Sequence, residues 1–353
     1  MTTGLFVTTS DLDESSGGGN VSIHEYNALS KFCDHVDILT RKDVGSELYG
    51  FPFAWDNAIS NKVNNSYHMV HFNGHPFGRT ISNLRYFNED IKIVSSVPAH
   101  NIEVSREEHY KNGMDYDRMY SHMVEPKTLE RYITQDREAD LIIFPAKICR
   151  DYFMNRFKLT NKTAIIPHGC RLPPNLPSYP SHPSEIIFGY IGAFGPDKGV
   201  NYLVEAWNKL PKRTKLIFFG RDSEIAKHIL PKDIGIEVYG RYKDLDEIMP
   251  KFDVYVQPSA TEGYALGCIE AAAYGKPVIV SNGAGAHEVF TDEVDGFIVP
   301  ARDSLVLMQK MLYFIERQDE VVRMGKNAYD MAVHWDWNTV EGLYIKAYEE
   351  LFQ

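Results

Sequence analysis

The sequence predicts an α/β protein with two doubly wound domains, each built on a parallel sheet. Short apolar runs typical of buried strands alternate with helical segments along most of the chain, as in parallel sheets covered by helices. The length is a second observation, because 353 residues with 44% hydrophobic content can form two cores. A proline-rich stretch at 171–184 is the third, and we interpret it as the linker between the domains.

The N-terminal domain is expected to span residues 1–170. Its expected strands are 4–9, 36–39, 68–72, 91–95, 141–144 and 163–166. Gly17-Gly18-Gly19 follows the first strand and precedes a helix that ends near Phe32. Consecutive glycines can expose successive amides to a phosphate group, so we expect a diphosphate-binding loop there. A flexible turn is the alternative, because Ser22 replaces the third glycine of the dinucleotide fingerprint.

The second domain is expected at 185–337. Its expected strands are 186–191, 215–219, 236–239, 253–256, 277–280 and 296–299, with helices at 305–315 and 320–333, and a final helix is expected after the domain at 339–352. The last helix is amphipathic. The stretch 101–125 shows no clear period, and we interpret it as an insertion.

Two carboxylates, Glu262 and Glu270, bracket the turn from the strand at 253–256 into a helix that ends near Tyr274. Open α/β sheets bind ligands at the carboxyl ends of their strands, where unpaired helix amides can face a phosphate. Glu270 lies among apolar residues, so its charge is costly to bury unless something bonds it. A pair of ribose hydroxyls would satisfy it, and the turn therefore predicts a nucleotide-sugar site. The alternative is that Glu270 lies on a solvated helix face and Glu262 caps the helix.

Composition argues against several other classes of protein. A net charge of −11 argues against nucleic-acid binding, which needs clusters of basic residues. No apolar stretch approaches the roughly 18 residues that span a bilayer, so we expect a cytoplasmic protein for which peripheral membrane contact stays open. Two Asp-x-Asp patterns, at 11–13 and 244–246, are expected by chance among 48 acidic residues. The four cysteines lack paired spacing and are expected to be reduced core thiols, namely Cys33, Cys149, Cys170 and Cys268.

The segment 255–300 resembles the signature region of retaining GT-B glycosyltransferases of family four, or glycosyl transferases group 1. The matching residues are Pro258-Ser259, Glu262-Gly263-Tyr264, Glu270 to Val278, Ser281 to Val289 and Asp295 to Pro300. Shorter matches lie at Ile165 to Gly169, Gly192 to Gly199 and Trp335 to Trp337. Together they cover most of the second half of the chain, whereas the first half matches only in places.

The resemblance implies a GT-B fold, in which two Rossmann-like domains face a central cleft and the segment 338–353 packs back on the N-terminal, acceptor-side domain. It implies a retaining glycosyltransferase that works without a metal or cofactor. The donor would be a nucleoside-diphosphate sugar, with UDP-hexose expected first on family frequency. The acceptor would be a hydroxyl group of unknown identity, in glycan, polysaccharide or glycolipid synthesis. Under this reading 101–125 is an acceptor-side insertion.

The resemblance also implies roles for single residues. Glu262 would hold sugar hydroxyls, Lys198 would neutralise the leaving diphosphate, and His100 would bond the sugar or a phosphate oxygen. His71 and His75 remain rivals of His100. The expected donor-binding residues are Gly17, Gly18, Gly19, Arg241, Gly263, Tyr264, Ala265, Leu266 and Glu270.

One departure from the family pattern concerns charge. The family usually has an arginine just after the first glycine of the phosphate loop, whereas this chain has Ala193. Arg241, a nucleobase neighbour in this reading, and Arg221 are the two candidates for compensation. Two alternatives to transfer stay open: a sugar-nucleotide epimerase or phosphorylase of the same fold, and a non-catalytic sugar-nucleotide-binding protein.

Overall fold

The computed structural model describes residues 2–10, 12–13, 16–45, 52–63, 66–74, 84–85, 88–97, 101–116, 133–175, 177, 185–211, 214–220 and 235–353. The chain divides into two compact units: unit 1 contains residues 1–99, 116–168 and 337–353, and unit 2 contains 100–115 and 169–336. Each unit holds one six-stranded sheet in which every pairing is parallel. The prediction of two doubly wound α/β sheets is therefore confirmed.

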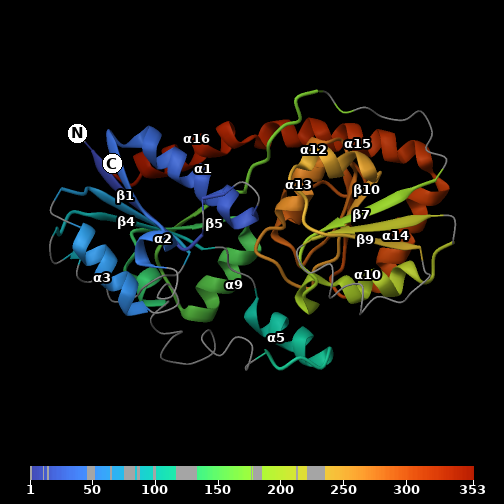
Figure 1. The fold of residues 1–353 in the computed structure, drawn as a ribbon, viewed down its shortest axis with the longest axis horizontal. Coiled ribbons are helices and arrows are strands. Elements are labelled where there is room, and N and C mark those ends of the chain that lie inside the picture. The colour runs from blue at the N-terminus through green and yellow to red at the C-terminus, as the bar shows by residue number, and fades with distance from the viewer. Residues whose placement is uncertain are drawn as a thin grey trace. The chain divides into compact units, whose positions relative to one another are not determined.

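The sheet of unit 1 has the strand order β2-β1-β3-β4-β5-β6. Its strands are β1 (Thr3–Thr8), β2 (His35–Leu39), β3 (Met69–Asn73), β4 (Lys92–Ser96), β5 (Leu141–Phe144) and β6 (Lys162–Ile165). Helices α1 (Gly17–Phe32) and α16 (Trp337–Glu349) lie on one face of this sheet, and α3 (Pro52–Lys62) and α9 (Lys147–Phe157) lie on the other (Figure 1). The short helix α2 (Arg41–Val44) follows β2.

Side chains alternate across this sheet as strand geometry requires. Leu5 and Val7 join a core cluster with Trp55 of α3, whereas Phe6 between them contacts the rings of Tyr26 and His71 on the other face.

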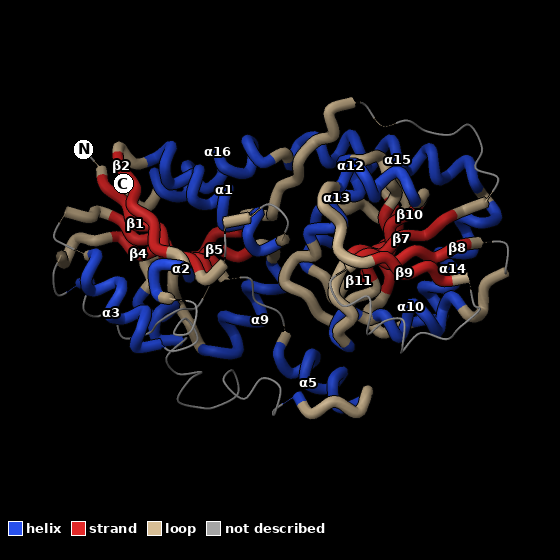
Figure 2. Tube along the Cα trace, viewed as in Figure 1, coloured by secondary structure: helices blue, strands red, loops and turns tan. Residues whose placement is uncertain are grey.

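The sheet of unit 2 has the strand order β12-β11-β10-β7-β8-β9. Its strands are β7 (Ile187–Ile191), β8 (Lys215–Phe219), β9 (Ile236–Tyr239), β10 (Val254–Gln257), β11 (Val278–Ser281) and β12 (Gly296–Val299). Helices α10 (Val200–Trp207) and α14 (Ser304–Glu316) cover one face, and α12 (Leu245–Ile248), α13 (Leu266–Ala273) and α15 (Gln318–Ala332) cover the other (Figure 2). Short 3-10 turns complete the unit: η1 (Pro196–Lys198), η2 (Met249–Lys251), η3 (Gly285–Val289) and η4 (Val333–Trp335).

Consecutive phenylalanines of β8 show why this sheet is buried on both faces. Phe218 packs into a cluster with α10 and α14, and Phe219 packs into the opposite cluster with α12 and α13. Both side chains are almost fully buried. Such a strand has apolar residues without a break, as parallel sheets between two helical layers do.

The glycine run corrects one expectation. Gly17, Gly18 and Gly19 form the first turn of α1 rather than a loop before it. Ser16 is the N-cap residue, and its hydroxyl accepts a hydrogen bond from the Gly19 amide at 3.0 Å. The first-turn amides of a helix have no partner within the helix, so the cap allows these poor helix formers to begin one.

A second correction concerns 101–125, where the sequence shows no period. Residues 102–111 form helix α5 (Ile102–Lys111), whose N-cap Asn101 accepts a hydrogen bond from the Val104 amide at 3.0 Å. The helix buries Glu108 rather than an apolar stripe, so hydrophobic periodicity cannot reveal it. Residues 117–125 lie outside the described part of the chain.

The cysteine prediction is confirmed, because all four thiols are free and buried. Within the described ranges no helix is long and apolar enough to cross a membrane.

The strand order reverses between β1 and β3 in unit 1 and between β7 and β10 in unit 2. Doubly wound sheets bind ligands at such reversals, outside the carboxyl ends of the strands. The loop after β7 carries Lys198, and the loop after β10 carries Glu262. The fold therefore brings these two predicted residues to the same point of unit 2.

Candidate functional site

The backbones of the two loops are joined at the strand-order reversal. The amides of Ala260 and Thr261 donate to the Asp197 carbonyl at 2.8 and 3.3 Å. Gly199 has a φ of +70°, and a Cβ atom there would lie 2.0 Å from the Pro258 carbonyl oxygen. Only glycine permits this approach, so Gly199 holds the Lys198 turn against the loop of Glu262.

The Glu262 carboxylate is held on both of its oxygens. Oε2 accepts hydrogen bonds from Ser259 Oγ at 2.8 Å and Gln257 Nε2 at 3.1 Å. Oε1 lies 2.8 Å from Lys198 Nζ. Tyr255 OH donates to Gln257 Oε1 at 2.7 Å, which leaves the amide nitrogen facing the carboxylate. The side chains of Lys198 and Glu262 are 24% and 21% exposed, so a ligand can reach both groups.

The rest of the loop is fixed by the segment after β11. The Glu262 amide donates to the Gly283 carbonyl at 2.9 Å, and the Ala286 amide donates to the Tyr264 carbonyl at 2.7 Å. Ala265 then adopts a left-handed φ of +77° before α13 begins. This conformation costs a residue with a Cβ atom about 1–2 kcal/mol. No side chain caps α13, and although the Cys268 amide donates to the Ala265 carbonyl at 3.0 Å, the amides of Leu266 and Gly267 lie at the helix start, where an anion can bind.

Glu270 lies in the second turn of α13 and is 9% exposed. Burial raises the pKa of its carboxyl to about 7, and the charge of Arg171 opposes that rise. Burial also raises the pKa of the Cys268 thiol, and Glu262 and Glu270 both add to this effect. Both carboxylates therefore lie close to the same buried sulfur atom.

Arg171 is fixed beside α13 by a cluster of polar groups. Its Nη2 lies 2.7 Å from Asp244 Oδ1 and 3.1 Å from Asp246 Oδ2, and it donates to Tyr274 OH at 3.2 Å. Tyr274 follows Glu270 by one helical turn, which explains why Arg171 acts on the Glu270 carboxyl. The Asp-x-Asp pattern at 244–246 is therefore engaged by an arginine.

The remaining predicted residues have different locations. Gly263, Tyr264, Ala265 and Leu266 form the turn into α13. Arg241 is exposed and follows β9 by two residues, whereas Gly17 to Gly19 belong to unit 1. His100, His75 and Arg221 lie outside the described residues.

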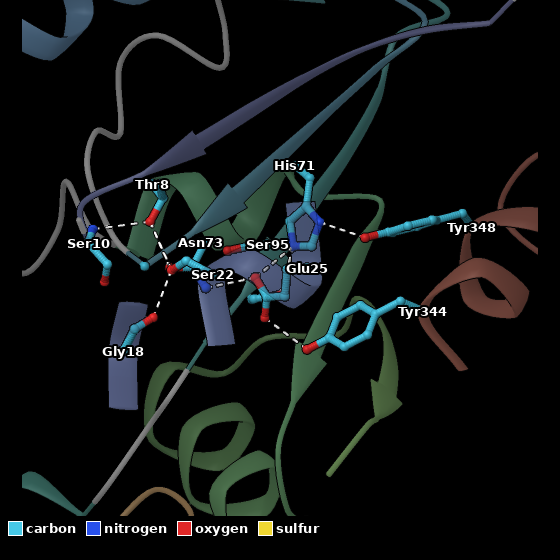
Figure 3. A network of polar contacts seen from close by, with 12 residues as sticks. Thr8, Ser10, Gly18, Ser22, Glu25, His71, Asn73, Ser95, Tyr344 and Tyr348 are labelled. Atoms are coloured by element: carbon cyan, nitrogen blue, oxygen red, sulfur yellow. Dashed lines mark hydrogen bonds and ion pairs between the residues drawn. The ribbon is translucent and has the colours of Figure 1, made fainter. Parts of the chain in front are cut away.

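His71, one of the rival histidines, belongs to a buried network in unit 1 (Figure 3). Its Nδ1 lies 2.8 Å from Tyr348 OH and its Nε2 lies 2.7 Å from Ser96 Oγ. Burial lowers the pKa of His71 to about 3, so the ring is neutral at neutral pH. Both ring nitrogens are engaged within the protein, which indicates a structural role.

Glu25 shares this network. Its carboxyl accepts hydrogen bonds from Asn73 Nδ2 at 2.7 Å and Tyr344 OH at 2.8 Å (Figure 3). Burial raises the pKa of Glu25 to about 7, although these hydrogen bonds oppose the rise. The network joins α1, β3 and α16 in the interior of unit 1.

The sequence reading missed the side chains that orient the site. Gln257 and Ser259 set the position of Glu262, and Arg171 acts on Glu270. Gln257 offered a signal, because it is a polar residue directly after the apolar run 254–256. Arg171 offered none, since it stands in the sequence far from its partners.

Comparison with known proteins gives a match to the family described as "Glycosyl transferases group 1" over residues 175–331. An uncharacterized glycosyltransferase of Methanocaldococcus jannaschii is 30% identical over 167 residues, which cover 46% of this chain and 47% of that protein. N,N'-diacetylbacillosaminyl-diphospho-undecaprenol alpha-1,3-N-acetylgalactosaminyltransferase of Campylobacter jejuni is 25% identical over 159 residues, covering 44% of this chain and 42% of that one. The chain therefore spans about half the length of these curated relatives.

Solved structures match over the whole chain. Anabaena HepE, crystallised with UDP and glucose, has a TM-score of 0.73 at 16% identity and covers 99% of this chain and 100% of its own. Sucrose-phosphate synthase from Thermosynechococcus elongatus has a TM-score of 0.76 at 20% identity, covering 100% and 99%. The lipopolysaccharide glycosyltransferase WaaG has a TM-score of 0.70 at 12% identity, covering 98% and 99%. The fold is therefore the GT-B fold.

Proposed function

Residues 175–331 belong to glycosyl transferases group 1, and from this premise we propose that the chain transfers a sugar from a nucleoside-diphosphate sugar to a hydroxyl acceptor. The observation that carries the proposal is the Lys198–Glu262 pair, 2.8 Å apart where the strand order of unit 2 reverses. A cation and a carboxylate at this point can bind the diphosphate and the sugar hydroxyls of one donor.

Glu270 supplies the second half of the donor site. A buried carboxylate with a raised pKa is costly to ionise without hydrogen-bond donors, and ribose offers two adjacent hydroxyls. Because Glu270 follows Glu262 along the same loop and helix, one extended ligand can contact both. We assign Glu270 to the ribose and Glu262 to the transferred sugar.

Lys198 and the first amides of α13 stabilise the departing diphosphate. The bond between the anomeric carbon and the phosphate oxygen breaks while the acceptor oxygen bonds to that carbon. Negative charge then grows on the diphosphate, so groups already aimed at it lower the barrier. The acceptor's proton passes to an oxygen of the leaving phosphate. Retention of configuration, a reaction without a metal, and the roles of Gly17 to Gly19 and Arg241 in donor binding rest on the family resemblance.

For the donor we propose UDP-hexose. HepE was crystallised with UDP and glucose, and an Escherichia coli relative, 30% identical over 132 residues covering 34% of each chain, is named for transfer from UDP-Gal to a GlcNAc-diphosphoundecaprenol. The Campylobacter jejuni relative is likewise named for a diphospho-undecaprenol acceptor. These names support an acceptor in polysaccharide or glycolipid synthesis.

The experiment is incubation of the purified protein with a panel of nucleoside-diphosphate sugars and detection of the released nucleoside diphosphate. A transferase hydrolyses its donor slowly when water replaces the acceptor. Glu270→Ala is expected mainly to weaken donor binding and Glu262→Ala mainly to lower turnover. Glu316→Gln removes an exposed charge from α14 and serves as the control.

Two outcomes contradict parts of the proposal. Thermal stabilisation by a donor with no hydrolysis or transfer would favour a non-catalytic binder, the alternative that Ala193 motivates. Kinetics equal to those of the unmodified protein in both glutamate variants would refute the assigned site.

A further inference from the structure

Helix α5 lies in the sequence between strands β4 and β5 of unit 1 but packs as part of unit 2. Its residues contact η1, the turn that ends in Lys198. The first half of the chain therefore contributes a helix to the unit that holds the candidate donor site.

One buried carboxylate attaches this helix. Glu108 has no exposed surface, and its Oε2 accepts a hydrogen bond from Tyr202 OH of α10 at 2.9 Å. Its Oε1 forms an ion pair with Arg302 Nε at 3.0 Å. A buried carboxylate costs free energy unless it is paired, and here Arg302, the Tyr202 hydroxyl and Lys111 of α5 itself, whose Nζ lies 3.4 Å from Oε1, pair it. These contacts therefore fix α5 at one position on unit 2.

Arg302 reaches α5 from the turn between β12 and α14. Its Nη2 also donates to Glu107 Oε2 at 3.0 Å and to the Val104 carbonyl at 3.4 Å. The backbone of Arg302 has a left-handed φ of +66°, which residues other than glycine rarely adopt. One guanidinium thus contacts three residues along the inner side of the helix.

The start of α5 meets the loop of Glu262. The Asn101 amide donates to Thr261 Oγ1 at 2.9 Å, and Thr261 is the residue before Glu262. The Thr261 amide in turn donates to the Asp197 carbonyl, next to Lys198. A helix that contacts both loops restricts the motion of one against the other.

We propose that α5 is a positioning element for the donor site, in which the Glu108–Arg302 ion pair keeps the Lys198 turn and the Glu262 loop in register. This inference rests on the proposed function for its kinetic consequence but not for its structural one. The helix contacts neither the donor nor the reacting atoms by this account. It acts by fixing the backbone from which the two site residues extend.

The variants Glu108→Gln and Arg302→Met test the ion pair, and Glu205→Gln is the matched control. Glu205 lies on α10 and forms an exposed pair with Lys209 at 3.0 Å, so its replacement removes the same charge without touching α5. The double variant Glu108→Gln/Arg302→Met tells whether the two residues act through each other. Its effect should be smaller than the sum of the two single effects, because the Glu108–Arg302 contact that both changes remove is lost only once.

Hydrogen–deuterium exchange is the first readout and needs no substrate. The amides of residues 195, 197–199 and 259–262 are expected to exchange faster in Glu108→Gln and Arg302→Met, while the amides of β7 and β10, and all amides in the control, keep unmodified rates. Unchanged exchange at both loops would overturn the proposal. Uniformly faster exchange throughout unit 2 would also overturn it, because the ion pair would then support the fold in general.

Donor hydrolysis is the second readout. We expect kcat to fall about tenfold or more in Glu108→Gln while KM for the donor changes about threefold or less, since small misplacements affect the reaction more than binding. Equal kcat in the unmodified protein and the variant would overturn the kinetic part. If the unmodified protein neither binds nor hydrolyses any donor, the proposed function fails, and the exchange experiment alone decides the role of α5.

Discussion

Replacing Glu270 with glutamine is expected to remove a pH dependence from donor binding. The Glu270 carboxyl has a pKa raised to about 7 by burial. Ribose hydroxyls donate hydrogen bonds, and the ionised carboxylate is the better acceptor, so the donor favours the ionised form. Protons therefore compete with the donor below the pKa. Affinity is retained above pH 7 and is lost as the pH falls through 7.

The size of the effect follows from the pKa. About half of Glu270 is ionised at pH 7, and about one-tenth at pH 6. Because only the ionised fraction binds well, affinity should weaken about tenfold, or about 1.4 kcal/mol, between pH 8 and pH 6. Binding at pH 7 should release about half a proton. In Glu270→Gln the slope should vanish, and affinity at pH 8 should be about 10- to 100-fold weaker, since a charge-assisted hydrogen bond contributes about 1.5–3 kcal/mol.

Isothermal calorimetry with an intact sugar nucleotide is the suitable assay. A free nucleoside diphosphate would confuse the result, because a terminal phosphate itself titrates near pH 6. Titrations in two buffers of different ionisation enthalpy give the number of protons released. Glu316→Gln should keep the unmodified slope. The reasoning is refuted if the unmodified protein and Glu270→Gln lose affinity equally between pH 8 and pH 6.

Three other changes test separate parts of the account. Lys198→Met should lower kcat for donor hydrolysis about 100-fold, since one preorganised donor to a developing anion contributes that much, and an unchanged kcat would exclude the assigned role. Gly199→Ala should destabilise unit 2 by several kcal/mol in urea unfolding, because the new Cβ atom would lie 2.0 Å from the Pro258 carbonyl oxygen at a φ of +70°; a wild-type midpoint would contradict this contact. Glu25→Gln should gain stability relative to the unmodified protein as the pH rises from 4.5 to 7, because the unfolded state ionises a carboxyl that stays protonated in the fold, and the gain should reach about 3 kcal/mol at pH 8. Parallel stability curves for the two proteins would refute the buried, protonated state of Glu25.

The sheets were predictable because buried parallel strands are marked by the local sequence. The expected strands 141–144, 215–219, 236–239 and 296–299 coincide with β5, β8, β9 and β12, and each of the other strands differs from its expected range by one residue at one or both ends. The central strands, such as β5, β8, β10 and β11, contain continuous apolar runs, and this pattern depends on no distant partner.

The corrected elements depend on partners that the local sequence does not show. The glycine run begins α1 because Ser16 caps it, and α5 forms around a carboxylate whose partners are Tyr202 and Arg302. A pattern search that counts apolar residues cannot recognise a helix attached through a buried ion pair.

The same distinction between local motifs and distant partners applies to the candidate site. Glu262, Glu270 and Lys198 stand in motifs of fixed spacing, so their positions at strand ends followed from the sequence. Arg171 and Gln257 contribute through contacts that only the fold creates.

A crystal structure with a bound nucleoside-diphosphate sugar tests the central claim most directly. We expect the ribose hydroxyls within hydrogen-bond distance of Glu270, the diphosphate at Lys198 and the first amides of α13, and the sugar hydroxyls at Glu262. A donor bound elsewhere, with the Lys198–Glu262 pair and Glu270 untouched, would contradict the account.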